Sequence, residues 1–507
     1  MNPKVLLILG HPRKESLGGA IYQSFRQGLI QAQVEFREII LTDTVFDPDV
    51  HQVSPSDQLL EDDLLRAQAL IKWADHLVFI YPTWWGTFPA RLKGFLDRVL
   101  TPGFAFYHRA DGAGWEKLLK GKTAQLITTM DTPPWVYRWF YKSPGHNALA
   151  RATLGFCGVR TVRKTVFGPV LEASAEDRIR WIEQSQREGL RLRNGVLSRI
   201  QRIGDKLSAW FKAARLQFYP MTVIAYAVGA LAATAAGQDL AVSRFWLGYL
   251  ALFFLELATV LSNDYFDFET DRRNVNAGPF TGGSRVLVNE ELSFHEVRVG
   301  IWVSLTLFLI VASLLVQQVP AFNAALMTLL ALTVLALGYT VPPLKLSHRG
   351  LGELDVAVTH STGVMLCGYI LQGGTWNDPL PWLLGVPLLV AVLPAIILSG
   401  IPDYEADKAA SKNTLVVKLG CRMAVKLAMA ATGLAAGLCI AWRGFNLVGD
   451  AFTGLIIIVV PHAAVLIWML RRHLLKANPP ARIDGLMIMA LTFILWFGLI
   501  PFIRLLE

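Results

Sequence analysis

The chain has 507 residues and a formal net charge of +9, and 53% of its residues are hydrophobic. This length allows two or more domains, and the mean hydropathy of +0.40 excludes a single soluble domain. The four cysteines show neither metal-ligand spacing nor a disulfide pattern, which indicates free thiols in a reducing compartment.

Residues 1–195 have the composition of a soluble α/β domain, in which short apolar stretches alternate with amphipathic ones. Strands are expected over 4–9, 34–40, 76–81, 123–129 and 162–167, and helices over 17–31, 89–100 and 174–192. Five strands with helices between them predict a doubly wound parallel sheet of flavodoxin-like order.

Two loops at the expected carboxyl ends of strands hold residues suited to a phosphorylated, aromatic ligand. The loop after the first strand leads into a helix, whose N-terminal N–H groups can bind phosphate. The loop after the third strand contains adjacent Trp84 and Trp85, which can form a flat wall for a ring system. Ordinary core packing is the alternative for these two side chains. Ligands of open α/β sheets bind at this edge.

A basic segment, residues 196–217, follows. Its apolar residues recur at helical spacing between Arg and Lys, which predicts an amphipathic helix at the membrane surface; a solvated linker is the alternative. Residues 218–507 then form an all-α membrane domain with nine stretches long enough to span a bilayer. The spans are expected at 218–237, 245–262, 299–316, 321–339, 354–371, 382–398, 424–442, 452–470 and 485–503.

Basic residues predict how these spans are oriented. The loops after the even-numbered spans hold most of the Arg and Lys, whereas the opposite side holds only Arg244, Arg443 and Arg504. This bias predicts a multi-pass protein of the plasma (inner) membrane, with the N-terminal domain in the cytoplasm and the C-terminus outside. No cleavable signal peptide is expected, because the first apolar run is too short. The positive charge favours membrane lipids and anionic substrates as partners, and not nucleic acid.

Two acidic clusters, each at the end of an apolar span, are the strongest functional signal. The first contains Asn263, Asp264, Asp267 and Asp271, and the second contains Asp403 and Asp407. Aspartates four residues apart share one face of a helix. Carboxylates that converge near a bilayer need cations, and Mg²⁺ typically bridges such groups to substrate phosphates. The clusters therefore predict a Mg²⁺–diphosphate site at a membrane surface.

With these motifs, residues 215–507 resemble the UbiA superfamily of intramembrane prenyltransferases. The resemblance also includes Gly282-Gly283-Ser284-Arg285 and the segments 339–345 and 412–420. Within the superfamily the chain looks most like the branch that prenylates 1,4-dihydroxy-2-naphthoate in menaquinone biosynthesis. Where many members carry an Asn ahead of the second Asp pair, this chain reads Ser399-Gly400-Ile401-Pro402.

The resemblance implies roles for the residues that match its motifs. Lys345 and Arg285 would bind the diphosphate of a prenyl diphosphate, and Tyr339 would flank the allylic cation through a cation–π contact. The expected metal ligands are Asn263, Asp264, Asp267, Asp271, Asp403 and Asp407, and these five aspartates also count as catalytic residues.

Three further polar residues lie inside expected spans. Glu256 precedes Asn263 by seven residues and shares its helical face, so we expect it to orient an acceptor hydroxyl or to take a ring proton. Asp355 and His360 share the fifth span. For all three, an interhelical hydrogen bond is the alternative role.

Residues 1–195 resemble the flavin-dependent NAD(P)H:quinone oxidoreductases of flavodoxin-like fold, through the two loops and the segments 92–106 and 156–158. The resemblance implies a flavin, either FMN or FAD, with NAD(P)H as reductant, and a homodimer formed through this domain. Tyr137, Tyr141 and His146 lie where the family places active-site groups. The usual Thr-Thr-Gly-Gly is replaced by Thr128-Thr129-Met130-Asp131. The implied flavin contacts are His11, Ser16 and Leu17 for the phosphate, and Pro82, Thr83, Trp84, Trp85, Gly86, Thr128 and Thr129 for the ring.

The two parts together predict a bifunctional membrane enzyme. A quinone is electron-poor and does not attack a carbocation, whereas the hydroquinone made by the reductase does. Linkage in one chain would raise the local concentration of this intermediate. Two alternatives stay open: a membrane-tethered quinone reductase, and a prenyltransferase with a non-catalytic N-terminal docking domain.

Overall fold

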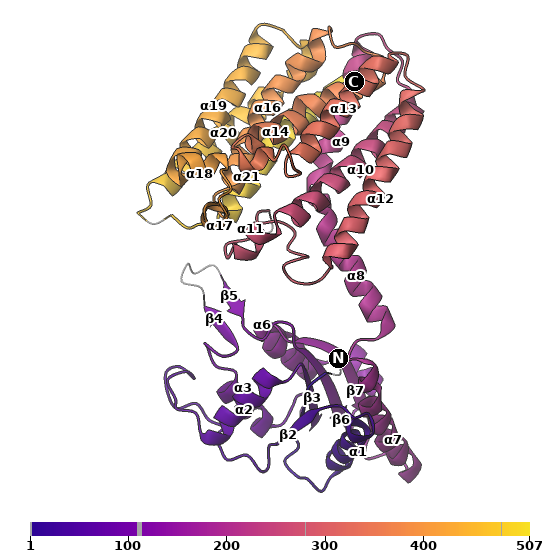
Figure 1. Ribbon diagram of the computed structural model, residues 1–507. Helices are drawn as coiled ribbons and strands as arrows, with labels where there is room; N and C mark the ends of the chain where they lie inside the picture. Colours follow the sequence, from indigo (N-terminus) through magenta and orange to yellow (C-terminus); the bar gives the residue numbers. More distant parts are fainter. Residues whose placement is uncertain (1–2, 109–113, 279, 478) are drawn as a thin grey trace. The chain divides into compact units, whose positions relative to one another are not determined.

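The computed structural model describes residues 3–108, 114–278, 280–477 and 479–507. The chain divides into two compact units, Met1–Arg202 and Ile203–Glu507, coloured from indigo to purple and from magenta to yellow in Figure 1. The division falls inside the predicted basic segment. The expected domain boundaries at 195/196 and 217/218 stay predictions.

The first unit is built on a parallel sheet. In the described part of this unit the sheet has five strands in the order β2-β1-β3-β6-β7. They are β1 (Val5–Leu9), β2 (Phe36–Ile40), β3 (His76–Pro82), β6 (Thr123–Thr129) and β7 (Arg160–Phe167). Counted along the sheet strands alone, this order is 2-1-3-4-5, which is the flavodoxin-like order. The predicted α/β parallel sheet is therefore confirmed.

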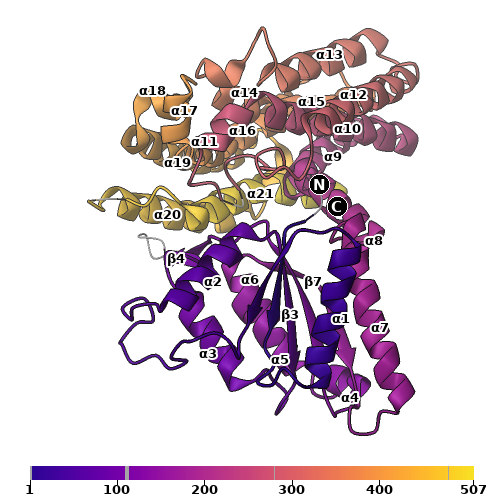
Figure 2. The same cartoon turned by 60° about the horizontal axis from the view of Figure 1, so that its bottom comes forward.

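Helices cover both faces of this sheet (Figure 2). In β1, Val5, Leu7 and Leu9 are buried on one face and Leu6 and Ile8 on the other, because side chains alternate along a strand. On the first face α1 (Leu17–Gln31) packs beside α7 (Ala175–Arg191). The second face is covered by α2 (Asp62–Trp73) and α3 (Ala90–Val99).

Smaller elements complete the first unit. The capping box of Ser174 and Asp177, each bonded to the other's backbone N–H, starts α7. The sequence did not predict α2, the antiparallel hairpin β4–β5 or the short helices of this unit. The hairpin strands are β4 (Phe106–His108) and β5 (Trp115–Lys117). The short helices are α4 (Pro134–Trp139), α5 (Pro144–Asn147), the π-helix η1 (Ala148–Leu154) and α6 (Gly155–Cys157), which precede β7, and the 3₁₀-helix η2 (Leu192–Asn194), which follows α7.

The second unit is a helical bundle that begins within α8 (Arg199–Ala214). Its other helices are α9 (Tyr219–Ala235), α10 (Val242–Phe266), α11 (Phe268–Arg273), α12 (Phe294–Val316), α13 (Phe322–Gly338), α14 (Gly352–Val358), α15 (Val364–Leu371), α16 (Pro379–Ser399), α17 (Tyr404–Ala409), α18 (Leu415–Leu419), α19 (Cys421–Gly444), α20 (Leu455–Leu474) and α21 (Asp484–Leu506). The π-helical turn η5 (Thr359–Gly363) joins α14 to α15, and η3 (Leu216–Phe218), η4 (Leu346–His348) and η6 (Gly449–Phe452) are 3₁₀-helices.

Within the described ranges, eight helical stretches are long and apolar enough to span a bilayer. The predicted fourth span corresponds to α13, which has 17 residues and is shorter than these eight. The count of nine spans is therefore not confirmed, but the chain is a multi-pass membrane protein with an α-helical second unit.

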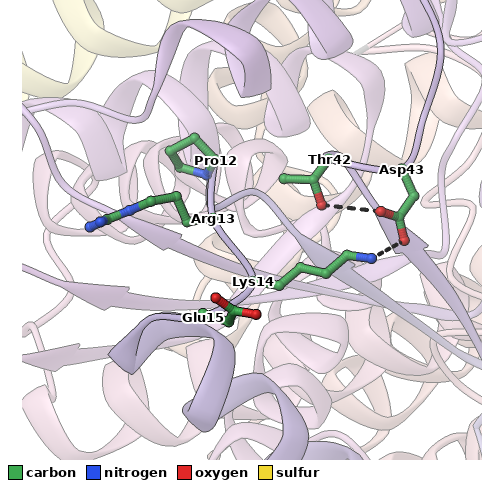
Figure 3. Close-up of a pocket in the computed structure, with 6 residues that line it drawn as sticks. All are labelled: Pro12, Arg13, Lys14, Glu15, Thr42 and Asp43. Atoms are coloured by element: carbon green, nitrogen blue, oxygen red, sulfur yellow. Dashed lines mark hydrogen bonds and ion pairs between the residues drawn. The ribbon is translucent and has the colours of Figure 1, made fainter.

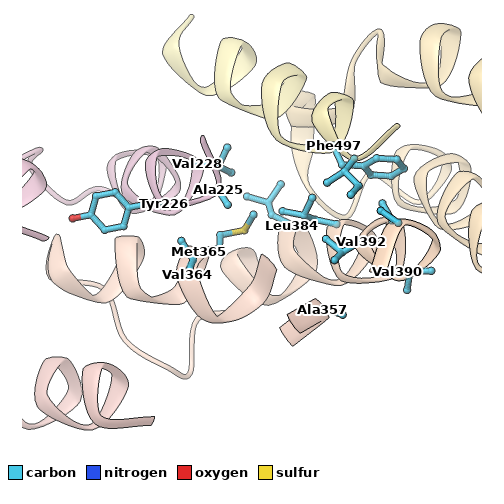
Figure 4. Packing of buried hydrophobic residues seen from close by; sticks show 14 of the residues in the cluster. Ala225, Tyr226, Val228, Ala357, Val364, Met365, Leu384, Val390, Val392 and Phe497 are labelled. Atoms are coloured by element: carbon cyan, nitrogen blue, oxygen red, sulfur yellow. The ribbon is translucent and has the colours of Figure 1, made fainter. Parts of the chain in front are cut away.

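Buried hydrophobic side chains, among them Ala225 of α9 and Met365 of α15, pack together in the bundle (Figure 4), and two glycines let these two helices come close. A Cβ added to Gly229 of α9 would lie 1.9 Å from the carbonyl oxygen of Met365 in α15. A Cβ added to Gly368 of α15 would lie 2.1 Å from the carbonyl oxygen of Tyr226 in α9. Only glycine permits this backbone contact. Small residues at the interface are typical of membrane helices, which associate by close packing because the hydrophobic effect does not drive them together in lipid.

Candidate active sites

The first candidate site lies at the carboxyl ends of β1, β3 and β6, which are neighbours in the middle of the sheet. The sheet order therefore brings together the loops that the sequence singled out. The backbone N–H of Thr83 donates to the carbonyl of Thr129 over 2.7 Å and joins the β3 loop to the end of β6. Thr128 and Thr129 are both buried there.

The loop after β1 is held in a fixed shape. Ser16 is the N-cap of α1, and its hydroxyl accepts the N–H of Gly19 over 3.1 Å. Nδ1 of the buried His11 accepts the N–H of Arg13 over 3.0 Å. Leu17 is the first residue of α1. The implied phosphate contacts His11, Ser16 and Leu17 thus surround a helix N-terminus.

The loop after β3 exposes its two tryptophans. The N–H groups of Trp84 and Thr87 donate to each other's carbonyl, which closes a tight turn. Trp85 and Gly86 both have positive φ in this turn, of 51° and 75°. The Trp85 side chain is fully exposed and that of Trp84 is 47% exposed, so core packing is not their role.

Tyr137 connects this turn to the helices that follow β6. Its hydroxyl donates to the carbonyl of Gly86 over 3.1 Å and accepts the N–H of Gly145 over 3.0 Å. Nε2 of His146 lies 3.1 Å from Oγ1 of Thr128. Burial lowers the pKa of His146 to about 4, so the imidazole is neutral at pH 7. Tyr141, by contrast, is exposed.

A polar hollow of about 410 Å³ lies beside the β1 loop, next to the residues that follow β2 (Figure 3). It is lined by Pro12, Arg13, Lys14, Glu15, Thr42 and Asp43. Nζ of Lys14 and Oδ2 of Asp43 form an ion pair across it at 2.5 Å. Both side chains are more than half exposed, so this pair contributes little to stability.

The second candidate site is formed by the two acidic clusters, which meet in the second unit. In the first cluster Nδ2 of Asn263 donates to Oδ2 of Asp267 over 3.0 Å. The guanidinium of Arg215 forms an ion pair with Asp264 and donates to Oδ1 of Asn263 over 3.2 Å. The hydroxyl of Ser284 also donates to Asp264. Arg215 thus connects the segment after α8 to the first cluster.

Lys412 lies between the two clusters. Its Nζ is 2.8 Å from Oδ2 of Asp267 and 3.8 Å from Oδ1 of Asp407. Nδ2 of Asn274 donates to Oδ1 of Asp403 over 2.5 Å, which adds a second link between the clusters. A small cavity of about 50 Å³ lies beside the second cluster, and its polar lining is formed by Tyr339, Glu353, Ser399, Asp403, Asp407, Lys412 and Thr414.

Burial and mutual repulsion raise the pKa values of several carboxyl groups in this site. Burial, the main cause, raises the pKa of Asp271 and of Asp403 to about 7 and that of Asp407 to about 6. Neighbouring carboxylates act in the same direction in each case. Burial disfavours the Lys412 ammonium, but Asp267 and Asp407 outweigh this and raise its pKa. The site therefore favours the binding of cations.

The donor set fits Mg²⁺ in its chemistry. Hard oxygen ligands are those that Mg²⁺ prefers. Oδ1 of Asp267 and Oδ1 of Asp407 are buried without a hydrogen-bond partner in the described part of the chain. No three His, Cys, Asp or Glu side chains in that part are already arranged as a metal site. Lys412 and Arg215 instead neutralise the carboxylates.

The other predicted residues have different surroundings. Arg285 donates to the carbonyls of Asp271 and Asn274, and so holds the loop rather than a carboxylate. Among the described residues, no hydrogen bond or ion pair joins Lys345 to the acidic clusters. Glu256 lies two turns deeper in α10. Sequence reasoning gave no site role to Arg215, Lys412, Asn274 or Ser284. Only Lys412 and Ser284 carried a signal, since both belong to motifs of the resemblance.

Two family models match the chain. The model described as flavodoxin-like fold matches residues 3–188, and that of the UbiA prenyltransferase family matches residues 222–498.

Individual relatives match one unit each. The human ribosyldihydronicotinamide dehydrogenase [quinone] is 31% identical over 34% of this chain and 85% of its own length. The lycopene elongase/hydratase of Corynebacterium glutamicum is 28% identical over 38% of this chain and 64% of that protein. The apo structure of a UbiA homologue from Aeropyrum pernix K1 is 18% identical, covering 55% of this chain and 96% of that one, with a TM-score of 0.44. Several other curated relatives are matched over only about half of their length.

The two family models and the curated relatives agree with the two resemblances drawn from the sequence motifs. They support a membrane enzyme with oxidoreductase and transferase activities. The chain belongs to the UbiA prenyltransferase family, and a flavodoxin-like NAD(P)H quinone oxidoreductase domain precedes its prenyltransferase domain.

Proposed function

We propose that the first unit reduces a quinone with NAD(P)H through a bound flavin, and that the second unit prenylates the resulting hydroquinone in the membrane. The observation that supports this proposal is that one chain carries a quinone-oxidoreductase-like domain and a UbiA prenyltransferase domain, in which Lys412 lies between the two acidic clusters. The product would be a prenylquinone of the menaquinone type. The proposal places the first unit in the cytoplasm, beside the plasma (inner) membrane.

In the first unit, a bound flavin would supply the transfer of two electrons from a nicotinamide to a quinone. The N–H groups at the start of α1, with His11 and Ser16, would bind its phosphate, whether in FMN or FAD. The segment from Pro82 to Gly86, with Thr128 and Thr129, would bind the ring. The exposed Trp84 fits such a ligand, as does the buried hydroxyl of Thr83, which has no hydrogen-bond partner among the residues that the structure describes. We also expect a homodimer through this unit.

In the second unit, bound Mg²⁺ would neutralise the charge of the departing diphosphate of a prenyl diphosphate. Asn263, Asp264, Asp267, Asp271, Asp403 and Asp407 would hold the metal. Lys345 would add positive charge at the diphosphate, and Tyr339 would present its ring to the allylic cation. Lys412 would offset the repulsion between the clusters before the substrate binds. The bundle would exclude water from the cation.

The test is an anaerobic assay of the purified full chain with Mg²⁺, a long-chain prenyl diphosphate and an oxidised naphthoquinone. Prenylated product, identified by mass spectrometry, is expected only when NADPH or NADH is present. The Asp267→Asn variant should lose prenyl transfer and keep quinone reduction. Glu269→Gln is the matched control, because Glu269 lies in the same acidic segment but is exposed.

The outcomes separate the proposal from its alternatives. Quinone reduction without any prenyl transfer would favour a tethered reductase. Prenyl transfer that is indifferent to NAD(P)H, by a protein without flavin absorbance, would favour a docking role for the first unit. The similarity to a lycopene elongase/hydratase makes a polyene the second candidate acceptor, and lycopene therefore belongs in the acceptor panel.

A further inference from the structure

Three polar side chains along the seam between α9 and α10 each end in a buried oxygen atom. They are Tyr219 and Thr222 on α9 and Glu256 on α10. In the described part of the chain, Oη of Tyr219, Oγ1 of Thr222 and Oε2 of Glu256 form no hydrogen bond. Tyr219 is 5% exposed and Thr222 is 4% exposed. Thr222 lies within hydrogen-bonding reach of the Glu256 carboxyl group, and Tyr219 lies near enough to interact with its charge.

A buried polar group destabilises the protein when it has no hydrogen-bond partner. Here three such atoms lie at the seam between two candidate spans. Two hydroxyls can each donate or accept a hydrogen bond, and a carboxylate accepts. Together they complement a ligand that carries both a hydroxyl donor and an oxygen acceptor.

The surroundings of these three groups are aromatic. The ring of Tyr219 lies 5.2 Å, centroid to centroid, from that of Phe253. Tyr249 lies on the same face of α10 as Glu256, seven residues earlier, and is also close to its carboxyl group. A small ion would not need these walls, whereas a flat ring with hydroxyl substituents would pack against them.

The seam also leads to the acidic site. Glu256 precedes Asn263 by seven residues of α10, or about 10 Å along the helix axis. On the other side of the seam, Arg215 lies one turn before Tyr219 and pairs with Asp264. A ring bound at Glu256 would therefore lie about two turns from the end of α10, where the first acidic cluster is located.

We infer that Tyr219, Thr222 and Glu256 form the binding site for the hydroxyl groups of an aromatic acceptor, with the Glu256 carboxylate accepting the hydrogen bond of a ring hydroxyl. This inference rests on the proposed function. It adds the acceptor site and the chemical class of its ligand, a ring with at least one free hydroxyl.

The experiment compares a naphthohydroquinone with its dimethyl ether, which has no free hydroxyl, as acceptors for the full chain in nanodiscs. A site built around a hydroxyl rejects analogues that lack one, so kcat/KM should fall by roughly 100-fold or more for the ether. In Glu256→Gln this discrimination should fall to about tenfold or less. The KM for the acceptor should rise, and the KM for the prenyl diphosphate should stay unchanged.

Related variants keep the inference testable if Glu256→Gln does not fold. Tyr219→Phe and Thr222→Val should each raise the KM for the acceptor, and Glu256→Asp should restore part of the discrimination. Thr259→Val is the matched control, because Thr259 lies on α10 and its hydroxyl is already bonded to the carbonyl of Leu255.

Unchanged discrimination and unchanged acceptor KM in the folded variants would overturn the inference while leaving the proposed function intact. A wild-type chain that prenylates no hydroxylated aromatic would overturn the proposed function itself. If Glu256→Gln is folded but inactive, retention of naphthohydroquinone binding at wild-type affinity would also overturn the inference, and its loss would support it.

Discussion

The ammonium group of Lys412 lies 2.8 Å from Oδ2 of Asp267, although 145 residues separate the two in the chain. It also lies 3.8 Å from Asp407, so one internal cation stands between the two acidic clusters. The clusters are thus adjacent before any substrate binds. Lys412 belongs to the loop after the second cluster, which makes this loop part of the site.

Replacement of Lys412 by Met should destabilise the protein when Mg²⁺ is absent. Loss of one partner of a buried ion pair leaves the other charge uncompensated and costs about 3–5 kcal/mol. Added Mg²⁺ should recover more stability in the variant than in the wild type, because it takes over the neutralisation of Asp267 and Asp407. Thermal unfolding with and without Mg²⁺ measures this. Lys408→Met, at an exposed site in the preceding helix, should behave like the wild type.

Arg215 should be required for prenyl transfer but not for quinone reduction. Its guanidinium pairs with Asp264, and the side chains of the two residues are 18% and 3% exposed. Arg215→Gln should cost about 3–5 kcal/mol of stability and lower the rate of prenyl transfer, since Asp264 loses its fixed position. Both activities are to be measured on the same preparation. Lys212→Gln is the control, because Lys212 pairs with Glu291 at the surface. Equal loss of both activities would contradict the prediction.

Buried histidines should make the first unit sensitive to acid. Burial lowers the pKa of His76, which is 0% exposed, from its ordinary value of 6.5 to about 4. The unfolded chain therefore binds a proton from about pH 6.5 downward, while the folded chain does not until about pH 4. Stability should be full above pH 6.5 and should fall by about 3 kcal/mol as the pH drops towards 4.

The measurement is hydrogen exchange of the full chain, corrected for the intrinsic effect of pH, in peptides from β3 and β6. His76→Asn should flatten the decline, because the variant keeps a polar group near Thr123 but does not titrate. The buried His146 acts in the same direction, so part of the decline should persist. His51→Asn, at an exposed position, should leave the pH profile unchanged.

Tyr137 should hold the flavin-binding loop through its hydroxyl. Tyr137→Phe removes a donor to Gly86 and an acceptor for Gly145, while the ring stays in place. We expect flavin affinity to fall about fivefold, since a net hydrogen bond contributes about 1 kcal/mol and about 1.4 kcal/mol corresponds to tenfold. Flavin titration by fluorescence gives the Kd. Tyr141→Phe is the control because its ring is exposed, and equal affinities for the two variants would sink the prediction.

The sequence predicted the features that depend on local patterns. Short apolar runs located the strands of the sheet, and helix α1 has the bounds expected from sequence, Leu17–Gln31. Helix α2 was missed, although its buried residues Leu64, Ala67, Leu70 and Ile71 recur at helical spacing. The motifs around Asp264 and Asp407 led to the correct family, since four-residue spacing of carboxylates on a helix is visible in the sequence.

The sequence by itself determined the two kinds of domain and the acidic clusters, because periodicity and short motifs are local properties of the chain. Only the tertiary structure decided which cations neutralise these clusters, and that Tyr219, Thr222 and Glu256 share one unsatisfied seam. Pairings such as that of Lys412 with Asp267 join residues that are distant in the chain. A buried charge is costly unless an opposite charge is buried beside it, and the packing of all the helices decides which charges are buried together.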